Sequence, residues 1–108
     1  MLTPKEAALF SAAREKLYSA AVGDILDSMG QYRNFLPARI RPISTEMVVV
    51  GKAKPVVVED GTGTGDRPAG KLLEALDSLS EGDVYITDGG SSEYALWGEL
   101  LSTRATHL

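Results

Sequence analysis

The chain has 108 residues, of which 44% are hydrophobic and 24% are charged, and its formal net charge is −4. This length and balance predict one domain, residues 1–108, with a single core, and they argue against a disordered chain. No apolar run approaches the roughly 18 residues of a membrane span. The mild acidity offers no electrostatic footprint for nucleic acid.

The chain contains no cysteine and one histidine, His107. Disulfides, thiolate metal sites and a His-rich metal site are therefore excluded. The N-terminus, MLTPKEAALF, lacks the basic segment and long apolar core of a signal peptide. We expect a cytoplasmic protein without a membrane or nucleic-acid partner.

Residues 4–29 have the pattern of two successive helices. Thr3 is a capping residue, Pro4 suits the first helical position and Glu6 supports the same start. Apolar residues then recur at helical spacing in two runs: Leu9, Ala13, Leu17 and Ala20, followed by Val22, Ile25, Leu26 and Met29. Gly30 predicts the end of the second helix.

An irregular or extended segment is expected at residues 31–44, because its two prolines exclude a regular helix. Two strands are predicted next, residues 47–50 and residues 52–58, with a break at Gly51. Pro55 lacks an amide hydrogen, so it must lie at an edge or a bulge of the sheet.

A glycine loop, EDGTGTGD at residues 59–66, connects the second of these strands to a helix from Arg67 to about residue 79. The apolar stripe of that helix is expected to pack in the core, and its members are Leu72, Leu73, Leu76 and Leu79. A turn at residues 80–83 and a short buried strand, VYIT, follow, and Asp88 closes the strand.

A last helix is predicted from Ser92 or Glu93 through Leu108. Strands that alternate with helices in this half of the chain indicate an α/β fold. Because no glycine, proline or asparagine closes the last helix, we expect further chain after Leu108, with a frayed terminal helix as the alternative.

The glycine loop permits one cofactor hypothesis, an S-adenosylmethionine-dependent methyltransferase. Glycines lie between a strand and a helix, and Asp88 ends the next strand, where such enzymes bind ribose hydroxyls. Against it, the chain is too short for the required strands, Pro68 follows the loop at once, and two helices and a predicted strand pair precede the supposed first strand of such a domain.

A second candidate site surrounds Gly98, which falls inside the last predicted helix and costs about 1 kcal/mol there relative to alanine. A helical turn that begins at Gly98 would point the amides of Glu99, Leu100 and Leu101 outward together. Such amides bind anions, including carboxylates. The alternative is a glycine tolerated at a helix–helix contact.

The whole chain resembles the RraA-like family, which contains the regulator of ribonuclease activity A and the 4-hydroxy-4-methyl-2-oxoglutarate / 4-carboxy-4-hydroxy-2-oxoadipate aldolases. Some of its members carry a demethylmenaquinone methyltransferase label. The segments that carry the resemblance are AAVGDILDSMG, LPARIRPI, MVVVGKAKPVVV, EGDVYITDGG and ALWGELLSTRA. The last is the most specific, and Glu99 matches the acid of its Gly-Asp/Glu-Leu-Leu motif.

The resemblance implies a class II aldolase or oxaloacetate decarboxylase acting on a 2-oxo acid, with Mg²⁺ or Mn²⁺ stabilising the pyruvate enolate. The amides around Gly98, Leu100 and Leu101 would hold the pyruvyl group, and Glu99 would orient water or assist proton transfer. Arg67 stands where many aldolase members have a substrate-binding asparagine.

The resemblance also implies a layered α/β fold of the swivelling β/β/α type, here lacking its C-terminal part, and homotrimeric rings that are sometimes doubled. The family's Arg-Asp pair, which clamps substrate and holds the metal, does not occur in the 108 residues. We therefore expect that this chain alone neither binds the metal nor catalyses cleavage. A non-catalytic regulator of ribonuclease E is the alternative function.

Overall fold

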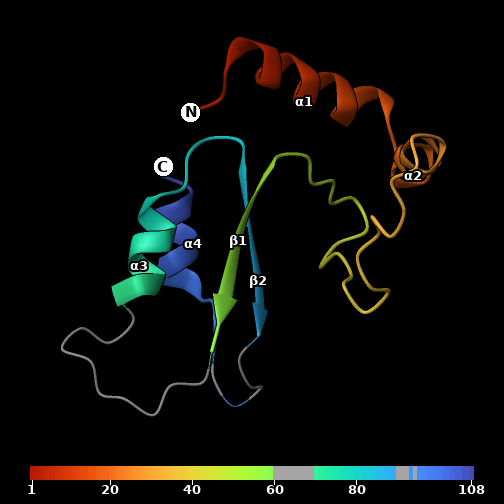
Figure 1. Cartoon of the computed structure of the whole chain (residues 1–108). Helices are drawn as coiled ribbons and strands as arrows, with labels where there is room; N and C mark the ends of the chain where they lie inside the picture. The colour runs from red at the N-terminus through yellow and green to blue at the C-terminus, as the bar shows by residue number, and fades with distance from the viewer. Residues whose placement is uncertain (60–69, 90–92, 94) are drawn as a thin grey trace. The chain divides into compact units, whose positions relative to one another are not determined.

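The fold is described by a computed structural model over residues 1–59, 70–89, 93 and 95–108 (Figure 1). The chain forms two units. Thr3–Val50 is called the helical unit here, and Met1–Leu2 with Gly51–Leu108 is called the sheet unit.

The helical unit begins with α1, Pro4–Lys16, and α2, Ser19–Ser28. The Thr3 hydroxyl accepts a hydrogen bond from the Glu6 amide at 3.2 Å, and the Glu6 carboxylate accepts one from the Thr3 amide at 2.8 Å. This reciprocal capping box confirms the predicted helix start. Gly30 follows α2 with a φ of 76°, a left-handed value that glycine adopts without strain and that ends the helix as predicted.

Residues 31–50 form no helix or strand. The expectation for residues 31–44 is confirmed, but the strand predicted at residues 47–50 is wrong. A strand exists only where a second strand pairs with its backbone, and within the described part of the chain only β1 and β2 pair. The Val50 carbonyl instead accepts a hydrogen bond from the Arg14 guanidinium at 3.2 Å.

The sheet unit is built on two parallel strands, β1, Lys52–Val58, and β2, Asp83–Gly89. Their register runs from Lys52 opposite Asp83 to Val58 opposite Gly89. Pro55 lies in β1 opposite Ile86. In a two-stranded sheet each strand has one unpaired outer edge, and edge strands are where proline is tolerated.

Helix α3, Gly70–Asp77, lies between β1 and β2 along the chain and belongs to the crossover connection that joins these two parallel strands. Leu76 is 2% exposed, so the predicted core stripe is right at this position, but Leu73 is 47% exposed and does not pack in the core. The predicted start of this helix at Arg67 lies outside the described residues. The expected burial of the VYIT strand is also wrong, because β2 is half-buried only over its first three residues and Ile86 is 40% exposed.

The turn between α3 and β2 forms as predicted: the Asp83 amide donates to the Ser80 carbonyl at 3.0 Å. The last helix, α4, is shorter than predicted and covers Glu99–Ala105. It lies beside α3 (Figure 1), where Arg104 forms an ion pair with Asp77 at 3.0 Å. Helices and a parallel strand pair together confirm an α/β class.

Among the described residues, no helix combines the length and the hydropathy that crossing a membrane requires.

Candidate functional site

A helix starts next to Gly98, as one of the sequence-based alternatives predicted. Gly98 is extended, with φ −163° and ψ −174°, and it caps α4, whose first residue is Glu99. The first backbone bond of the helix runs from the Ser102 amide to the Gly98 carbonyl at 3.0 Å. The amides of Glu99, Leu100 and Leu101 therefore have no hydrogen-bond acceptor inside the helix. Free amides at a helix start favour the binding of an anion.

All four residues named from the sequence lie together at this helix start. Gly98 and Glu99 are exposed, Leu100 is 85% exposed and Leu101 is half-buried. A Cβ added to Gly98 would meet no described atom within 4 Å. Among the described residues, Gly98 therefore makes no close helix–helix contact.

Two aromatic residues that the sequence reasoning missed hold this turn. The Trp97 indole N–H donates to the Ser102 hydroxyl at 2.8 Å, which links the residue before the cap to the second turn of α4. The Trp97 ring lies against Tyr85 of β2, with centroids 5.0 Å apart and planes inclined by 40°. A tilted pair of this kind contributes roughly 0.5–1.5 kcal/mol beyond its buried area. Trp97 is the only tryptophan of the chain and directly precedes Gly98, which is the signal that could have identified it.

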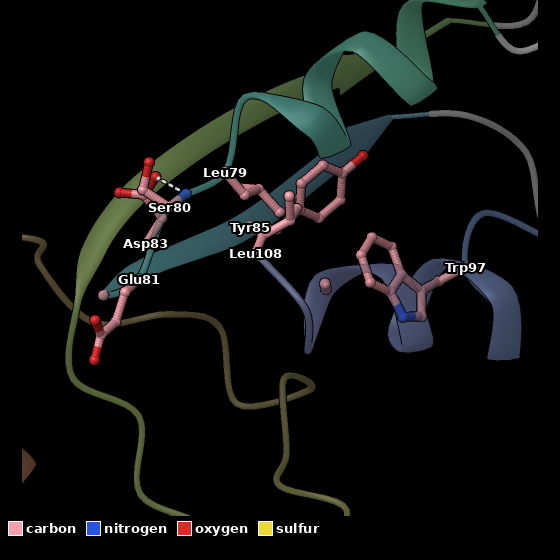
Figure 2. Close-up of a pocket in the computed structure, with 9 residues that line it drawn as sticks. Leu79, Ser80, Glu81, Asp83, Tyr85, Trp97 and Leu108 are labelled. Atoms are coloured by element: carbon pink, nitrogen blue, oxygen red, sulfur yellow. Dashed lines mark hydrogen bonds between the residues drawn. The ribbon is translucent and has the colours of Figure 1, made fainter. Parts of the chain in front are cut away.

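A cavity of about 250 Å³ lies beside the same aromatic pair (Figure 2). Its walls come from the α3–β2 turn, β2 and the end of the chain: Leu79, Ser80, Glu81, Gly82, Asp83, Tyr85, Trp97, Ala105 and Leu108. None of the four residues predicted for the site lines it. The cavity and the helix start are therefore separate features that share Trp97 as a neighbour.

The acid at the cavity wall has a structural role. The Asp83 carboxylate accepts a hydrogen bond from the Ser80 amide at 2.9 Å (Figure 2) and lies 3.7 Å from the Lys54 ammonium. Its side chain is 7% exposed, whereas that of Lys54 is 40% exposed. These contacts hold the α3–β2 turn against β1, so the Asp83 carboxylate has a structural role in the fold.

The described residues form no preassembled cluster of carboxylates for a divalent metal. Within the ranges that the structure covers, no group of three His, Asp or Glu side chains lies close enough to hold an ion. Glu99 belongs to no such group among the described residues. The glycine loop and Arg67, which the sequence analysis discussed for cofactor and substrate binding, lie outside the described residues.

Comparison with known proteins gives a match at the level of a family. A family model described as RraA-like, Aldolase/RraA, matches residues 19–108, a range that includes β1, β2 and the whole of α4. No curated protein and no solved structure matches the chain.

Proposed function

The chain belongs to the RraA-like (Aldolase/RraA) family, and we propose that it carries the 2-oxo-acid-binding segment of a divalent-metal-dependent class II aldolase or oxaloacetate decarboxylase. One observation carries the proposal: α4 begins at Glu99, directly after the extended Gly98, so that the amides of Glu99, Leu100 and Leu101 form its first turn inside the matched range.

The substrate carboxylate would lie at this first turn. It would accept hydrogen bonds from the amides of Glu99, Leu100 and Leu101, and the extended backbone of Gly98 leaves the approach open. A negative charge at an exposed helix start gains only about 0.3–1 kcal/mol, whereas a dissociation constant of 1 mM requires about 4.1 kcal/mol. The turn orients the substrate, and most of the binding free energy must come from other groups.

Glu99 is the proposed proton-handling group. Its carboxylate belongs to the first residue of α4 and is exposed, so it would stand next to the bound pyruvyl group. A carboxylate in this position repels the substrate charge unless water or a transferred proton lies between them. We therefore assign Glu99 to orienting a water molecule or passing a proton to the enolate carbon.

We propose that the Mg²⁺ or Mn²⁺ of the family takes ligands from outside the described residues, among which no group of three His, Asp or Glu side chains lies together. We propose that this 108-residue chain does not cleave 2-oxo acids by itself. We further propose the homotrimeric or hexameric ring and the layered swivelling fold that the resemblance implies.

The test separates binding from turnover. Binding is measured with pyruvate by ligand-observed NMR on the chain and on two variants of one position. Leu100→Pro removes one amide donor from the first turn, where proline is tolerated, whereas Leu100→Ala keeps the amide. We expect a weak pyruvate signal that Leu100→Ala retains and Leu100→Pro loses, with circular dichroism confirming the helix in both. Equal signals from the two variants would contradict the assignment.

Turnover is measured as pyruvate release from oxaloacetate with Mg²⁺ or Mn²⁺, with the metal-only rate subtracted because these ions decarboxylate oxaloacetate without protein. We expect no release above that rate. Activity of the 108-residue chain would refute the claim that it needs further ligands.

A non-catalytic regulator of ribonuclease E is the second candidate. It is favoured by the family match, whose description names RraA beside aldolase. Inhibition of ribonuclease E by a chain that binds no pyruvate would select it. The family match lends no support to a methyltransferase, and calorimetry with S-adenosylmethionine would test that hypothesis directly.

A further inference from the structure

The cavity beside the Tyr85–Trp97 pair plays no part in the proposed function. All of its wall residues belong to the sheet unit, so it forms within one unit of the chain. Its volume of about 250 Å³ exceeds the roughly 150 Å³ of a cavity that holds benzene and lies below the roughly 300–1,000 Å³ of sites for drug-sized ligands. The volume therefore suits a ligand with one ring and a short substituent.

The interior of the cavity is apolar and aromatic. The rings of Tyr85 and Trp97 form one side of it. Leu79 and Leu108 lie between these rings and the α3–β2 turn (Figure 2). Trp97 remains 39% exposed although it packs on Tyr85, so part of its surface is available to a ligand. Aromatic rings of this kind attract both apolar groups and cations.

The rim of the cavity at the α3–β2 turn is acidic. The charged side chains among the described wall residues are Glu81 and Asp83. Asp83 is engaged with the Ser80 amide and lies near Lys54, whereas the exposed Glu81 carboxylate points away from the rings (Figure 2) and pairs with no described residue. The sheet unit as a whole has five basic and ten acidic residues, a net charge of −5. Charge therefore favours a cation over an anion at this rim.

We propose that this cavity binds a small organic cation, an alkylammonium that carries an aromatic ring. The ring enters the apolar interior beside Trp97, and the ammonium stays at the rim near Glu81, where water still solvates it. This placement avoids the cost of burying a charge, while the aromatic pair supplies apolar and cation–π contact. A carboxylate of the same shape would meet the negative charge of the rim, so the cavity should reject a 2-oxo acid. The proposal does not depend on the proposed function.

The experiment is a titration of the isotope-labelled 108-residue chain with benzylamine, benzyl alcohol and benzoate, followed in proton–nitrogen correlation spectra at neutral pH. The three probes share one ring and differ in the charge of the head group. Trp97 is the only tryptophan, so its single indole N–H signal reports on the cavity wall. We expect a saturable shift with benzylamine and a dissociation constant on the order of 1–10 mM. Benzyl alcohol should bind about two- to fivefold more weakly, and benzoate should not saturate the signal.

Two variants test the rim and the interior separately. Glu81→Gln removes the rim charge, so benzylamine should bind with the affinity of benzyl alcohol, whose own affinity should not change. Glu74→Gln is the matched control, because it makes the same change in net charge at an exposed position of α3 that does not line the cavity. Ala105→Leu fills the interior and should abolish saturation by both probes. Thr106→Leu adds a similar side chain at the next, exposed residue and should bind like wild type.

Three results would overturn the proposal. They are a strictly linear response of the Trp97 signal to benzylamine, an affinity for benzoate equal to that for benzylamine, and an unchanged benzylamine affinity in Glu81→Gln. Circular dichroism shows whether Ala105→Leu is folded, and a folded Ala105→Leu that still binds benzylamine would also contradict the assignment to this cavity. The comparison of Glu81→Gln with Glu74→Gln decides the role of the rim charge whether or not Ala105→Leu folds.

Discussion

The ring of Phe35 lies over Gly23 of α2, so closely that a Cβ on Gly23 would overlap it. The contact fastens residues 31–44 to the preceding helix, although Phe35 remains 61% exposed. Gly23 is buried because the ring covers it.

Replacing Gly23 with alanine should loosen that segment without unfolding the helix. Alanine favours the helix interior by about 1 kcal/mol, while the new methyl group displaces the ring, so the two effects oppose each other in overall stability. We expect faster tryptic cleavage after Arg33 and Arg39, and the same increase in Phe35→Ala, which removes the ring and leaves the helix unchanged. Cleavage of Gly23→Ala at the wild-type rate would contradict this.

The Asp83 carboxylate is expected to contribute more to stability than its ion pair suggests. Asp83→Ala leaves the Ser80 amide without its acceptor in a part-buried turn, at a cost of about 1–3 kcal/mol. Lys54→Met should cost less than about 1 kcal/mol, because the ammonium is 40% exposed and screened by water. Urea unfolding of both variants, with the exposed neighbour substitution Glu81→Ala as control, measures the difference. Equal losses of unfolding free energy in Asp83→Ala and Lys54→Met would show that the ion pair, and not the hydrogen bond from Ser80, accounts for the contribution of Asp83.

Two glycines should respond oppositely to alanine. Gly89 has a φ of 90°, and a Cβ there would collide with the Val58 carbonyl of the paired strand. Gly89→Ala should therefore destabilise the end of the sheet by about 1–3 kcal/mol. Gly98 is extended and has open space around it, so Gly98→Ala should unfold at nearly the wild-type urea concentration. Equal midpoints for the two variants would refute the difference.

The Trp97–Ser102 hydrogen bond should be visible in fluorescence, since Trp97 is the only tryptophan. Ser102→Ala removes the acceptor and should shift the emission of Trp97 and lower stability by about 0.5–1.5 kcal/mol. Ser102→Thr keeps a hydroxyl and should retain most of the wild-type emission. An unchanged spectrum in Ser102→Ala would show that the bond does not form in solution.

Glu46 provides a pH-dependent contact. Hydrogen bonds from the Ser44 hydroxyl, from its own backbone amide and from the Thr45 hydroxyl lower the pKa of Glu46 below its ordinary value of 4.5. The stabilisation is thus present above about pH 4.5 and is lost as the pH falls through the lower pKa of the folded state. A carbon-detected NMR titration should show the midpoint of Glu46 rising in Ser44→Ala. An unchanged midpoint would show that the hydrogen bond from Ser44 is not what lowers the pKa of Glu46.

The sequence predicted features whose causes lie within a few residues. Thr3 and Glu6 cap α1 by contacts three positions apart, Gly30 ends α2 through its own φ, and Ser80 and Asp83 close a four-residue turn. A helix start at Gly98 was one of the predicted alternatives. It could be predicted because the cost of glycine in a helix interior is a local property and does not depend on distant parts of the chain.

Tertiary structure decided what depends on a remote partner. Residues 47–50 have the composition of a strand, yet no described strand pairs with them. Leu73 matches Leu76 in sequence pattern, but only Leu76 is covered. The contacts of Trp97 with Tyr85 and of Phe35 with Gly23 join separate elements. Capping and turn chemistry act through neighbouring backbone groups, whereas strand pairing and burial require atoms that only the folded chain brings together.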